Sequence, residues 1–328
     1  MENKVSVVMP VFNEVKFLKE SIESILSQSL TDFEFIILDD GSTDTSIKII
    51  ESYKDSRIKL IKSEHRGMVY QFNNGIRAAE SSLIARMDSD DVAEKNRLEE
   101  QLYFLKHNSD YSIVGSNVLF IDEDSKVVCK KKYPEHHNEI EFMMPVESAV
   151  CHPAVMIRSN VFSKYGQYEE SYGYASDHKL FLDFVSKGVK FYNLQKILLK
   201  YRVRTLRIDQ QRVNNANELS YKIGVDYLIT IHNKKSSKKE DYDYNYRMGL
   251  IEYYRGNIAK SRIYFLKCLH ISGKDSLRIV RFLMISILGN KAVKYLRRTK
   301  VLTFLSLYIN KSFKIDLHQI KPVNVFEK

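Results

Sequence analysis

The first hundred residues alternate between short apolar runs and stretches in which apolar residues recur at helical spacing. Each apolar run is typical of a buried strand, and each periodic stretch is typical of a helix. This βαβα order implies a largely parallel sheet with helices on both faces. The expected strands are Val5–Met9, Phe35–Leu38, Ile58–Ile61 and Leu83–Met87, and the expected helices cover Phe17–Leu26, Ile47–Tyr53 and Met68–Ala79.

The pattern changes after about Tyr111, where strand signals dominate and the strict alternation ends. A helix is expected over Asp177–Lys187. This mixture predicts an α+β arrangement for the second half of the α/β region. The expected strands are Ile113–Ile121, Lys126–Tyr133, Val155–Ile157, Val189–Tyr192 and Ile197–Val203.

After Asp209 the strand signals nearly vanish and helical periodicity takes over. Glycines separate several of the periodic stretches. The polar, highly charged segment His232–Asp243 is the expected linker. The expected helices cover residues 211–232, 243–256, 258–270, 275–288 and 290–298.

Charge divides the chain at nearly the same place as the secondary-structure pattern. The 328 residues carry a net charge of +10, but residues 1–200 have 25 basic side chains against 31 acidic ones, and residues 201–328 have 26 against 10. We therefore expect an α/β domain at residues 1–208, in two halves at 1–110 and 111–208, followed by a basic helical region at 209–328. The strongly basic part indicates an anionic partner.

Composition and cysteine usage narrow the class of protein. Apolar residues make up 44% and charged residues 28%, which excludes a disordered or fibrous chain. Cys129, Cys151 and Cys268 are far apart and form no CxxC pair, so neither a disulfide framework nor a zinc knuckle is expected. The start of the chain lacks a signal-peptide pattern, and no apolar stretch approaches the ~20 residues that span a bilayer. We expect a cytoplasmic protein that contacts a membrane only at its surface and does not span it.

Three polar segments follow expected strands at their carboxyl ends. These segments are Pro10–Glu14, Asp39–Asp44 and Asp88–Asp91. The carboxyl ends of parallel strands share one edge of the sheet, and ligands of open α/β sheets bind there. The sequence therefore predicts a ligand site at this edge.

The segment Asp88–Asp91 carries three carboxylates in four residues. These charges repel one another unless a cation neutralises them, and hard oxygen ligands suit Mg²⁺ or Mn²⁺ held partly by substrate phosphates. A solvated helix N-terminus is the alternative interpretation.

The segment Asp39–Asp44 also has two interpretations. It is either a turn with a helix cap or a pocket whose carboxylate accepts hydrogen bonds from a base or ribose. The chain contains neither GxGxxG nor GxxxxGK[ST], so neither a dinucleotide-binding Rossmann site nor a P-loop is supported.

Several motifs together carry a resemblance to a known family. They read Val5-Ser-Val-Val-Met-Pro-Val-Phe-Asn-Glu14, Asp39-Asp-Gly-Ser-Thr-Asp44 and Ala85-Arg-Met-Asp-Ser-Asp-Asp91. The segment Cys151-His-Pro-Ala-Val-Met-Ile157 is similar to the family's His-Pro segment, and Gly173-Tyr-Ala-Ser-Asp-His-Lys-Leu-Phe181 lies where the family carries Glu-Asp-x-Asp. In order and spacing these motifs resemble the family 2 glycosyltransferases of the GT-A fold, over roughly residues 4–205.

The resemblance implies an inverting transferase that uses a nucleotide-sugar, namely a UDP-hexose or a UDP-N-acetylhexosamine. It makes residues 1–110 the nucleotide-sugar half and residues 111–208 the acceptor half. In this family Asp39 would bind the uracil and Asp88 would face the ribose or sugar. The side chains expected around the nucleotide-sugar are Pro10, Phe12, Glu14, Asp39, Asp40, Arg66, Asn73, Arg86, Asp88 and Arg204.

The same resemblance assigns the metal and the proton transfer. Asp90 would ligate a divalent cation, Mn²⁺ or Mg²⁺, that bridges the two phosphates, with Asp91 next to it, and Asp177 aligns with the general base. The chemistry agrees, because a metal stabilises the charge that grows on the departing diphosphate. A single positioned carboxylate can take the proton of the acceptor hydroxyl.

The chain departs from the family pattern in two places. Ser176 and Lys179 stand where the family has acidic residues, so the acceptor pocket differs. The stretch Tyr201-Arg-Val-Arg204 stands where many relatives carry Tyr-Arg-x-His. Arginine cannot ligate a metal but pairs well with phosphate, so we expect Arg204 to bind the diphosphate and weaken the metal dependence. His152 is either a hydrogen-bonded structural residue or an acceptor-side contact.

The basic residues of the last part interleave with apolar ones. Between Arg247 and Lys300 there are 13 basic residues and two acidic ones. A helical domain with a solvated basic face, a nucleic-acid-binding region and peripheral attachment to an anionic membrane surface all fit this pattern. We favour the membrane surface because it suits a lipid-linked acceptor, and we expect no nucleic acid because no motif supports it.

Two alternatives to a glycosyltransferase remain at this point. A nucleotidyltransferase also uses metal-binding aspartates at a sheet edge, although Pro10–Glu14 is not the Gly-rich basic loop of that class. A catalytically inactive nucleotide-sugar-binding protein is the second alternative, because of Ser176 and Lys179. The favoured interpretation is a transferase that acts on a lipid-linked or surface-polysaccharide glycan at the inner face of the cell membrane.

Overall fold

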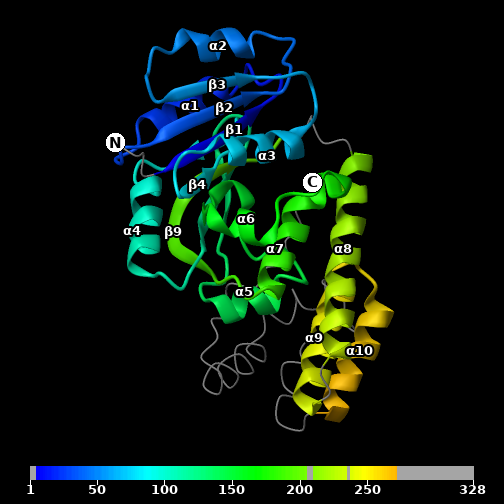
Figure 1. The fold of residues 1–328 in the computed structure, drawn as a ribbon. Helices are drawn as coiled ribbons and strands as arrows, with labels where there is room; N and C mark the ends of the chain where they lie inside the picture. Colours follow the sequence, from blue (N-terminus) through cyan, green and yellow to red (C-terminus); the bar gives the residue numbers. More distant parts are fainter. Residues whose placement is uncertain (1–4, 205–209, 235–236, 272–328) are drawn as a thin grey trace, which may run out of the picture. The chain divides into compact units, whose positions relative to one another are not determined.

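The computed structural model describes residues 5–204, 210–234 and 237–271 (Figure 1). The chain divides into two compact units, Met1–Tyr227 and Leu228–Lys328. The first unit is built on a β-sheet, and the described part of the second is helical.

The described residues of the first unit form a nine-stranded sheet in the order β3-β2-β1-β4-β8-β6-β9-β5, with β7 paired to β6 outside this path. The neighbours among β1 to β4 are parallel, while β5, β7 and β8 run antiparallel to their partners. The expected parallel sheet flanked by helices is thus confirmed. The strands are β1 Ser6–Val11, β2 Glu34–Asp39, β3 Ile58–Lys62, β4 Leu83–Arg86, β5 Val92–Ala93, β6 Ile113–Ile121, β7 Val127–Lys131, β8 Met156–Arg158 and β9 Phe191–Arg202.

Two apolar cores form because successive strand residues point to opposite faces of the sheet. In β1, Val7 and Met9 belong to one core, while Val8 belongs to the other. Helices α1, α2 and α4 contribute to the first core, and α3, α5, α6 and α7 contribute to the second. The helices are α1 Leu18–Leu26, α2 Ser46–Ser52, α3 Met68–Ala78, α4 Arg97–His107, α5 His137–Met143, α6 Asn160–Tyr165 and α7 Ser176–Ser186.

Helix α4 was not expected, because two of its buried positions are polar. Arg97 and Gln101 are fully buried and interrupt the apolar spacing of the helix. Their side chains are satisfied by the backbone of neighbouring elements: Gln101 Nε2 donates to the carbonyls of Val114 (3.1 Å) and Ala154 (2.7 Å). Tertiary hydrogen bonds of this kind leave no signal in the hydrophobic pattern.

Strand β9 is continuous where the sequence predicted two strands. The polar residues Asn193 and Gln195 lie inside it. Asn193 Nδ2 donates to the carbonyls of Pro134 (2.7 Å) and Ala149 (3.0 Å), so the amide nitrogen of this buried side chain is paired with neighbouring segments. The pairing with β6 shifts register beside Asn117, at the predicted gap.

The described helices after Arg204 are α8 Gln210–Asn233, α9 Lys238–Tyr254 and α10 Ile258–Ile271. The predicted linker His232–Asp243 was wrong in extent, because α9 begins inside it. The Ser237 hydroxyl accepts from the Glu240 N–H (3.3 Å), and the Glu240 carboxylate accepts from the Ser237 N–H (3.0 Å), which forms a capping box.

The predicted helices at residues 275–288 and 290–298 lie outside the described residues. Within the described ranges, no helix has both the length and the apolar character needed to cross a membrane.

The end of β9 is tied to the loop after β4 by Arg202, whose side chain is fully buried. Its backbone N–H donates to Asp91 Oδ1 (2.8 Å), and its Nε donates to the Asp90 carbonyl (2.8 Å). Its terminal nitrogens reach Glu20 Oε2 on α1 (2.6 Å) and the Asp122 carbonyl in the β6–β7 turn (3.0 Å). One guanidinium thus joins four parts of the first unit.

We expect Arg202→Met to lower the free energy of unfolding by about 3 kcal/mol, because it leaves buried acceptors without partners. Urea unfolding would measure the loss. The control is Lys200→Met on the same strand, which removes a half-exposed 3.6 Å pair with Glu94 and should cost less than about 1 kcal/mol. Equal losses for the two variants would contradict the role given to Arg202.

Candidate active site

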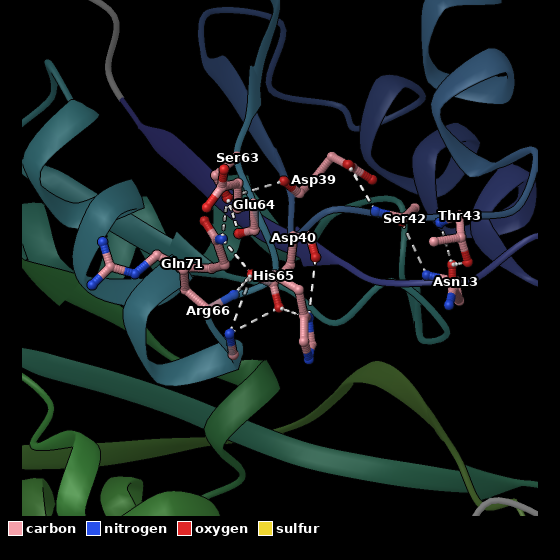
Figure 2. Close-up of polar contacts among 11 residues, drawn as sticks. Asn13, Asp39, Asp40, Ser42, Thr43, Ser63, Glu64, His65, Arg66 and Gln71 are labelled. Atoms are coloured by element: carbon pink, nitrogen blue, oxygen red, sulfur yellow. Dashed lines mark hydrogen bonds and ion pairs between the residues drawn. The ribbon is translucent and has the colours of Figure 1, made fainter.

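The turn after β1 and the segment after β2 are bonded to each other. Parallel pairing sets Val11 of β1 beside Asp39 of β2. Asn13 has φ +50°, and its Oδ1 accepts from the Thr43 N–H at 2.8 Å. The Asn13 N–H in turn donates to Ser42 Oγ at 3.0 Å (Figure 2). Two of the three predicted segments therefore form one surface.

Asp39 ends β2 with a buried carboxylate that is only half satisfied. Its Oδ2 accepts from the Ser42 N–H at 3.1 Å. Its Oδ1 is buried and has no hydrogen-bond partner among the described residues. A buried carboxylate oxygen without a partner is costly, so this atom is suited to a donor group on a ligand.

The Asp40 carboxylate, by contrast, already has hydrogen-bond partners within the protein. Its carboxylate accepts from the N–H groups of Arg66 (2.8 Å) and Gly67 (3.0 Å) and from Gln71 Nε2 (2.6 Å), and it lies 2.8 Å from His65 Nδ1 (Figure 2). These contacts hold the loop that leads into α3. The nucleotide contact predicted for Asp40 would have to displace one of them.

The loop held by Asp40 packs closely against the segment after β2. Gly41 has φ +72°, and a Cβ there would lie 2.7 Å from the His65 backbone nitrogen. Glycine is therefore required for this approach. The loop also places the Arg66 guanidinium over the Tyr70 ring at 4.1 Å.

An aromatic pair lies beside these carboxylates. Phe12 stacks on His65 with ring centroids 4.1 Å apart, and Phe12 is 41% exposed. Exposed aromatic rings of this kind suit a planar ligand. His65 was not singled out from the sequence, because nothing local indicates that its loop folds back onto Phe12. Pro10, also predicted here, lies within β1 and is half-buried.

The loop Asp88–Asp91 after β4 brings its three aspartates against arginines at the end of β4 and at or just after the end of β9. Asp88 Oδ1 lies 2.7 Å from Arg86 Nη2, and Asp90 Oδ2 lies 2.8 Å from Arg204 Nε. Asp91 Oδ1 accepts from the Arg202 backbone, as described above, and its Oδ2 is buried without a partner among the described residues.

The loop Asp88–Asp91, called the acidic loop below, carries more negative charge than these arginines neutralise. Burial, together with the charges of Asp88 and Glu14, raises the pKa of Asp90 to about 6, against the opposing effect of Arg204. Burial and the charges of Asp88 and Asp90 raise the pKa of Asp91 well above its usual value. Further positive charge would therefore be bound favourably here.

Arg204 connects the first and third segments. Its Nη2 lies 2.5 Å from Glu14 Oε2, while its Nε pairs with Asp90. The guanidinium also lies over the Phe17 ring at 4.8 Å. A cavity of about 330 Å³ opens beside this group and is lined by Asn13, Glu14, Val15, Lys16, Phe17, Asp44, Glu123 and Arg204.

The described residues contain no group of three or more His, Cys, Asp or Glu side chains that could hold a metal ion. Mg²⁺ commonly binds through one or two carboxylates together with water and substrate phosphates. Asp90 and the buried Oδ2 of Asp91 fit a cation of that kind and do not fit a cation held by protein alone.

Asp177 lies in the first turn of α7, and its side chain is about a quarter exposed. Its Oδ1 accepts from the His178 N–H at 2.8 Å, and its Oδ2 faces His152 Nδ1 at 3.9 Å. Burial raises the pKa of Asp177, against the opposing effects of the His178 N–H and the charges of His178 and Arg86. A carboxylate with a raised pKa is a stronger base than an exposed one.

The two departures beside Asp177 are accommodated locally. Ser176 is buried at the start of α7. The Lys179 ammonium lies 2.5 Å from Asp183 and 3.4 Å from Glu169, so its charge is neutralised by neighbours. Neither residue therefore removes Asp177 from the site.

Arg86 and Asn73 lie between the acidic loop and Asp177. The Arg86 guanidinium is buried over the Phe72 ring at 4.4 Å, and its Nε and Nη1 have no hydrogen-bond partner among the described residues. Asn73 uses both amide atoms on the Tyr168 backbone, donating to its carbonyl (2.8 Å) and accepting from its N–H (3.1 Å). Asn73 thus positions Tyr168, which was not singled out from the sequence.

Known proteins resemble this chain in sequence and in fold. The family model described as "Glycosyl transferase family 2" matches residues 6–166. An uncharacterised glycosyltransferase of Methanocaldococcus jannaschii is 35% identical over 240 residues, covering 70% of this chain and 80% of its own. The O-antigen biosynthesis glycosyltransferase WbnJ of Escherichia coli is 33% identical over 204 residues, covering 61% of this chain and 79% of its own.

Among solved structures, residues 1–349 of S. aureus TarS in complex with UDP-GlcNAc superpose with a TM-score of 0.60 at 16% identity, covering 94% of this chain and 91% of that one. At this identity the superposition shows the shared GT-A fold. The motifs, the fold and the extent of the sequence matches together place this chain in family 2 of the glycosyltransferases.

Proposed function

We propose that this protein is an inverting glycosyltransferase that moves a hexose or N-acetylhexosamine from a UDP-sugar to a hydroxyl of a lipid-linked or surface-polysaccharide glycan. The observation that carries the proposal is the buried Oδ1 of Asp39, unpartnered among the described residues, beside the exposed ring of Phe12. A uracil ring offers both a flat face and an N–H donor, which match these two groups. The TarS complex with UDP-GlcNAc and the O-antigen role of WbnJ support the donor and acceptor classes.

The proposal divides the α/β region by substrate. Residues 1–110 would bind the donor, because Asp39, Glu14 and the acidic loop all lie there. Residues 111–208 would bind the acceptor, because Asp177 and His152 lie there. The basic helical region at 209–328 would attach the protein to an anionic membrane surface.

The reaction requires one base and one stabilised leaving group. The acceptor oxygen would attack the anomeric carbon while Asp177 takes its proton, and the bond from that carbon to the diphosphate oxygen would break. A single displacement of this kind inverts the anomeric centre. The raised pKa of Asp177 suits it to accepting that proton.

The departing diphosphate needs positive charge. Asp90, with Asp91 beside it, would hold Mn²⁺ or Mg²⁺, which supplies charge stabilisation to the phosphates when bound. Arg204 would contribute a second positive charge by moving from Asp90 and Glu14 to a phosphate oxygen. Arg86, two of whose nitrogens have no partner among the described residues, would contribute a third.

Screening UDP-, GDP- and dTDP-sugars for transfer or hydrolysis with Mn²⁺ tests this function. We expect turnover with a UDP-sugar, and in Asp177→Asn we expect turnover to fall at least about a hundredfold while UDP still binds, since only the base is lost. Asp183→Asn on the same helix is the control and should keep its turnover. Binding without turnover of any sugar would identify an inactive nucleotide-sugar-binding protein, and full turnover by Asp177→Asn would remove Asp177 from the mechanism.

Measuring transfer with Mn²⁺ and in excess EDTA tests whether Arg204 shares the stabilisation of the diphosphate. We expect the wild-type protein to keep measurable transfer in excess EDTA, and Arg204→Ala to lose about tenfold in kcat/KM and all transfer in EDTA. Lys16→Ala, which lines the same cavity but pairs with Glu123 at 2.7 Å, is the control. Complete loss of wild-type activity in EDTA, with Arg204→Ala unchanged in Mn²⁺, would refute the shared role.

Features of the second unit support peripheral attachment to an anionic membrane surface. Helix α10 exposes Ile263 and Leu266, each more than half accessible, and Lys260 and Lys267 are exposed on the same helix. Residues three, four and seven apart share a face of a helix, so apolar and basic side chains meet there. Such a face binds anionic lipid through both burial and charge.

Co-sedimentation with lipid vesicles measures this attachment. We expect binding to phosphatidylglycerol vesicles but not to phosphatidylcholine vesicles, with release at high salt. Ile263→Glu together with Leu266→Glu should weaken binding, whereas Val127→Glu together with Val128→Glu, at exposed apolar positions of β7, should not. Equal binding to both lipids would contradict the proposal.

A further inference from the structure

A chain of polar contacts leads from helix α3 to the proposed base. Asn73 on α3 holds the backbone of Tyr168 through both of its amide atoms. The Tyr168 hydroxyl lies 2.7 Å from His152 Nε2. His152 Nδ1 in turn faces Asp177 Oδ2 at 3.9 Å. Asn73 of α3 and three residues between positions 152 and 177 thus form one series of contacts ending on the carboxylate.

The direction of the hydrogen bond to Tyr168 determines where the His152 ring carries its proton. Burial raises the pKa of Tyr168, so its hydroxyl keeps its proton. When that hydroxyl donates to Nε2, the neutral ring must carry its proton on Nδ1. The Nδ1–H group then points towards Asp177 Oδ2.

The His152 ring is held in this orientation by its packing. Its centroid lies 5.3 Å from that of Phe72, 5.4 Å from that of Tyr168 and 5.7 Å from that of Phe181, all in edge arrangements. Burial and the nearby charge of Arg86 lower the pKa of His152 well below its usual value, so the ring stays neutral. A neutral ring held by its packing therefore faces the base with its Nδ1 atom.

Four groups face the Asp177 carboxylate. Arg86 from the end of β4 and the His178 N–H of α7 favour its charged form, and His152 lies opposite Oδ2. Tyr168 lies near enough for the Asp177 charge to raise its pKa. His178 itself is turned away, since its Nε2 lies 2.7 Å from the Met144 carbonyl.

We propose that Tyr168 and His152 are positioning residues for Asp177, with Tyr168 fixing the His152 tautomer and the His152 Nδ1–H orienting Oδ2 of the base. The inference rests on the proposed role of Asp177. At 3.9 Å the contact is longer than a hydrogen bond, and catalytic hydrogen bonds tighten when substrate binds. The ring keeps its proton throughout, so Asp177 remains the group that accepts the proton of the acceptor.

The test compares Tyr168→Phe with Asp177→Asn in the full-length protein. Tyr168→Phe keeps the aromatic packing and removes only the hydroxyl. We expect its kcat to fall about tenfold with unchanged KM for the UDP-sugar. The acid limb of its pH–rate profile should move to higher pH, because a carboxylate that loses a donor holds its proton more tightly. Tyr165→Phe on helix α6 is the matched control and should show neither change.

A pair of His152 variants separates positioning from packing. His152→Asn keeps an N–H near the position of Nδ1 and should retain more activity than His152→Ala at equal donor affinity. Thermal unfolding of each variant with UDP bound reports whether the site is still folded.

The possible results separate the two proposals. Tyr168→Phe with wild-type kcat and pH profile, while Asp177→Asn is inactive, would overturn the positioning role and leave the base assignment intact. An active Asp177→Asn would overturn the base assignment whatever Tyr168→Phe does. A Tyr168→Phe variant that weakens donor binding and stability without moving the pH profile would show a structural role only and also overturn the inference.

Discussion

The first unit is organised around the need to neutralise carboxylates that are crowded together, buried or partly buried, at one edge of its sheet. Asp88, Asp90 and Asp91 follow β4 so closely that they cannot all be charged without compensation. The positive charge comes from Arg86 before the loop and from Arg204 just after β9, while the Arg202 backbone N–H donates a hydrogen bond to Asp91. The long strand β9 must therefore end at this loop.

The same arrangement joins the proposed donor and acceptor sides. Arg204 pairs with Glu14 from the turn after β1 and with Asp90 from the loop after β4. Arg86 lies on Phe72, whose ring also packs against His152 opposite Asp177. The groups proposed to bind the diphosphate are thus packed against those proposed to position the base, so the free energy of folding also maintains the active-site geometry.

Much of the candidate site could be predicted because its residues follow strands in local motifs. The carboxyl ends of parallel strands share an edge by geometry, so the order of strands and motifs along the chain was enough to predict that Asp39 and Asp90 follow strands at one edge of the sheet. The functions of Asp40, Asn73 and His152 could not be separated in this way. Asp40 and Asn73 carry polar groups like the others, and only their partners across the fold show that they hold a loop and Tyr168 respectively.

The sequence by itself determined the family and the parallel half of the sheet, and it predicted the edge where the proposed site lies, because periodicity and strand-end motifs are local properties. Tertiary structure alone decided that α4 is a helix, that β9 is continuous, and that His65 and Tyr168 lie beside the proposed site residues. In each case a side chain meets a partner from another segment of the chain: Gln101 bonds to Ala154, Asn193 to Pro134 and His152 to Tyr168, and His65 stacks on Phe12. Such partners become visible only when the chain has folded.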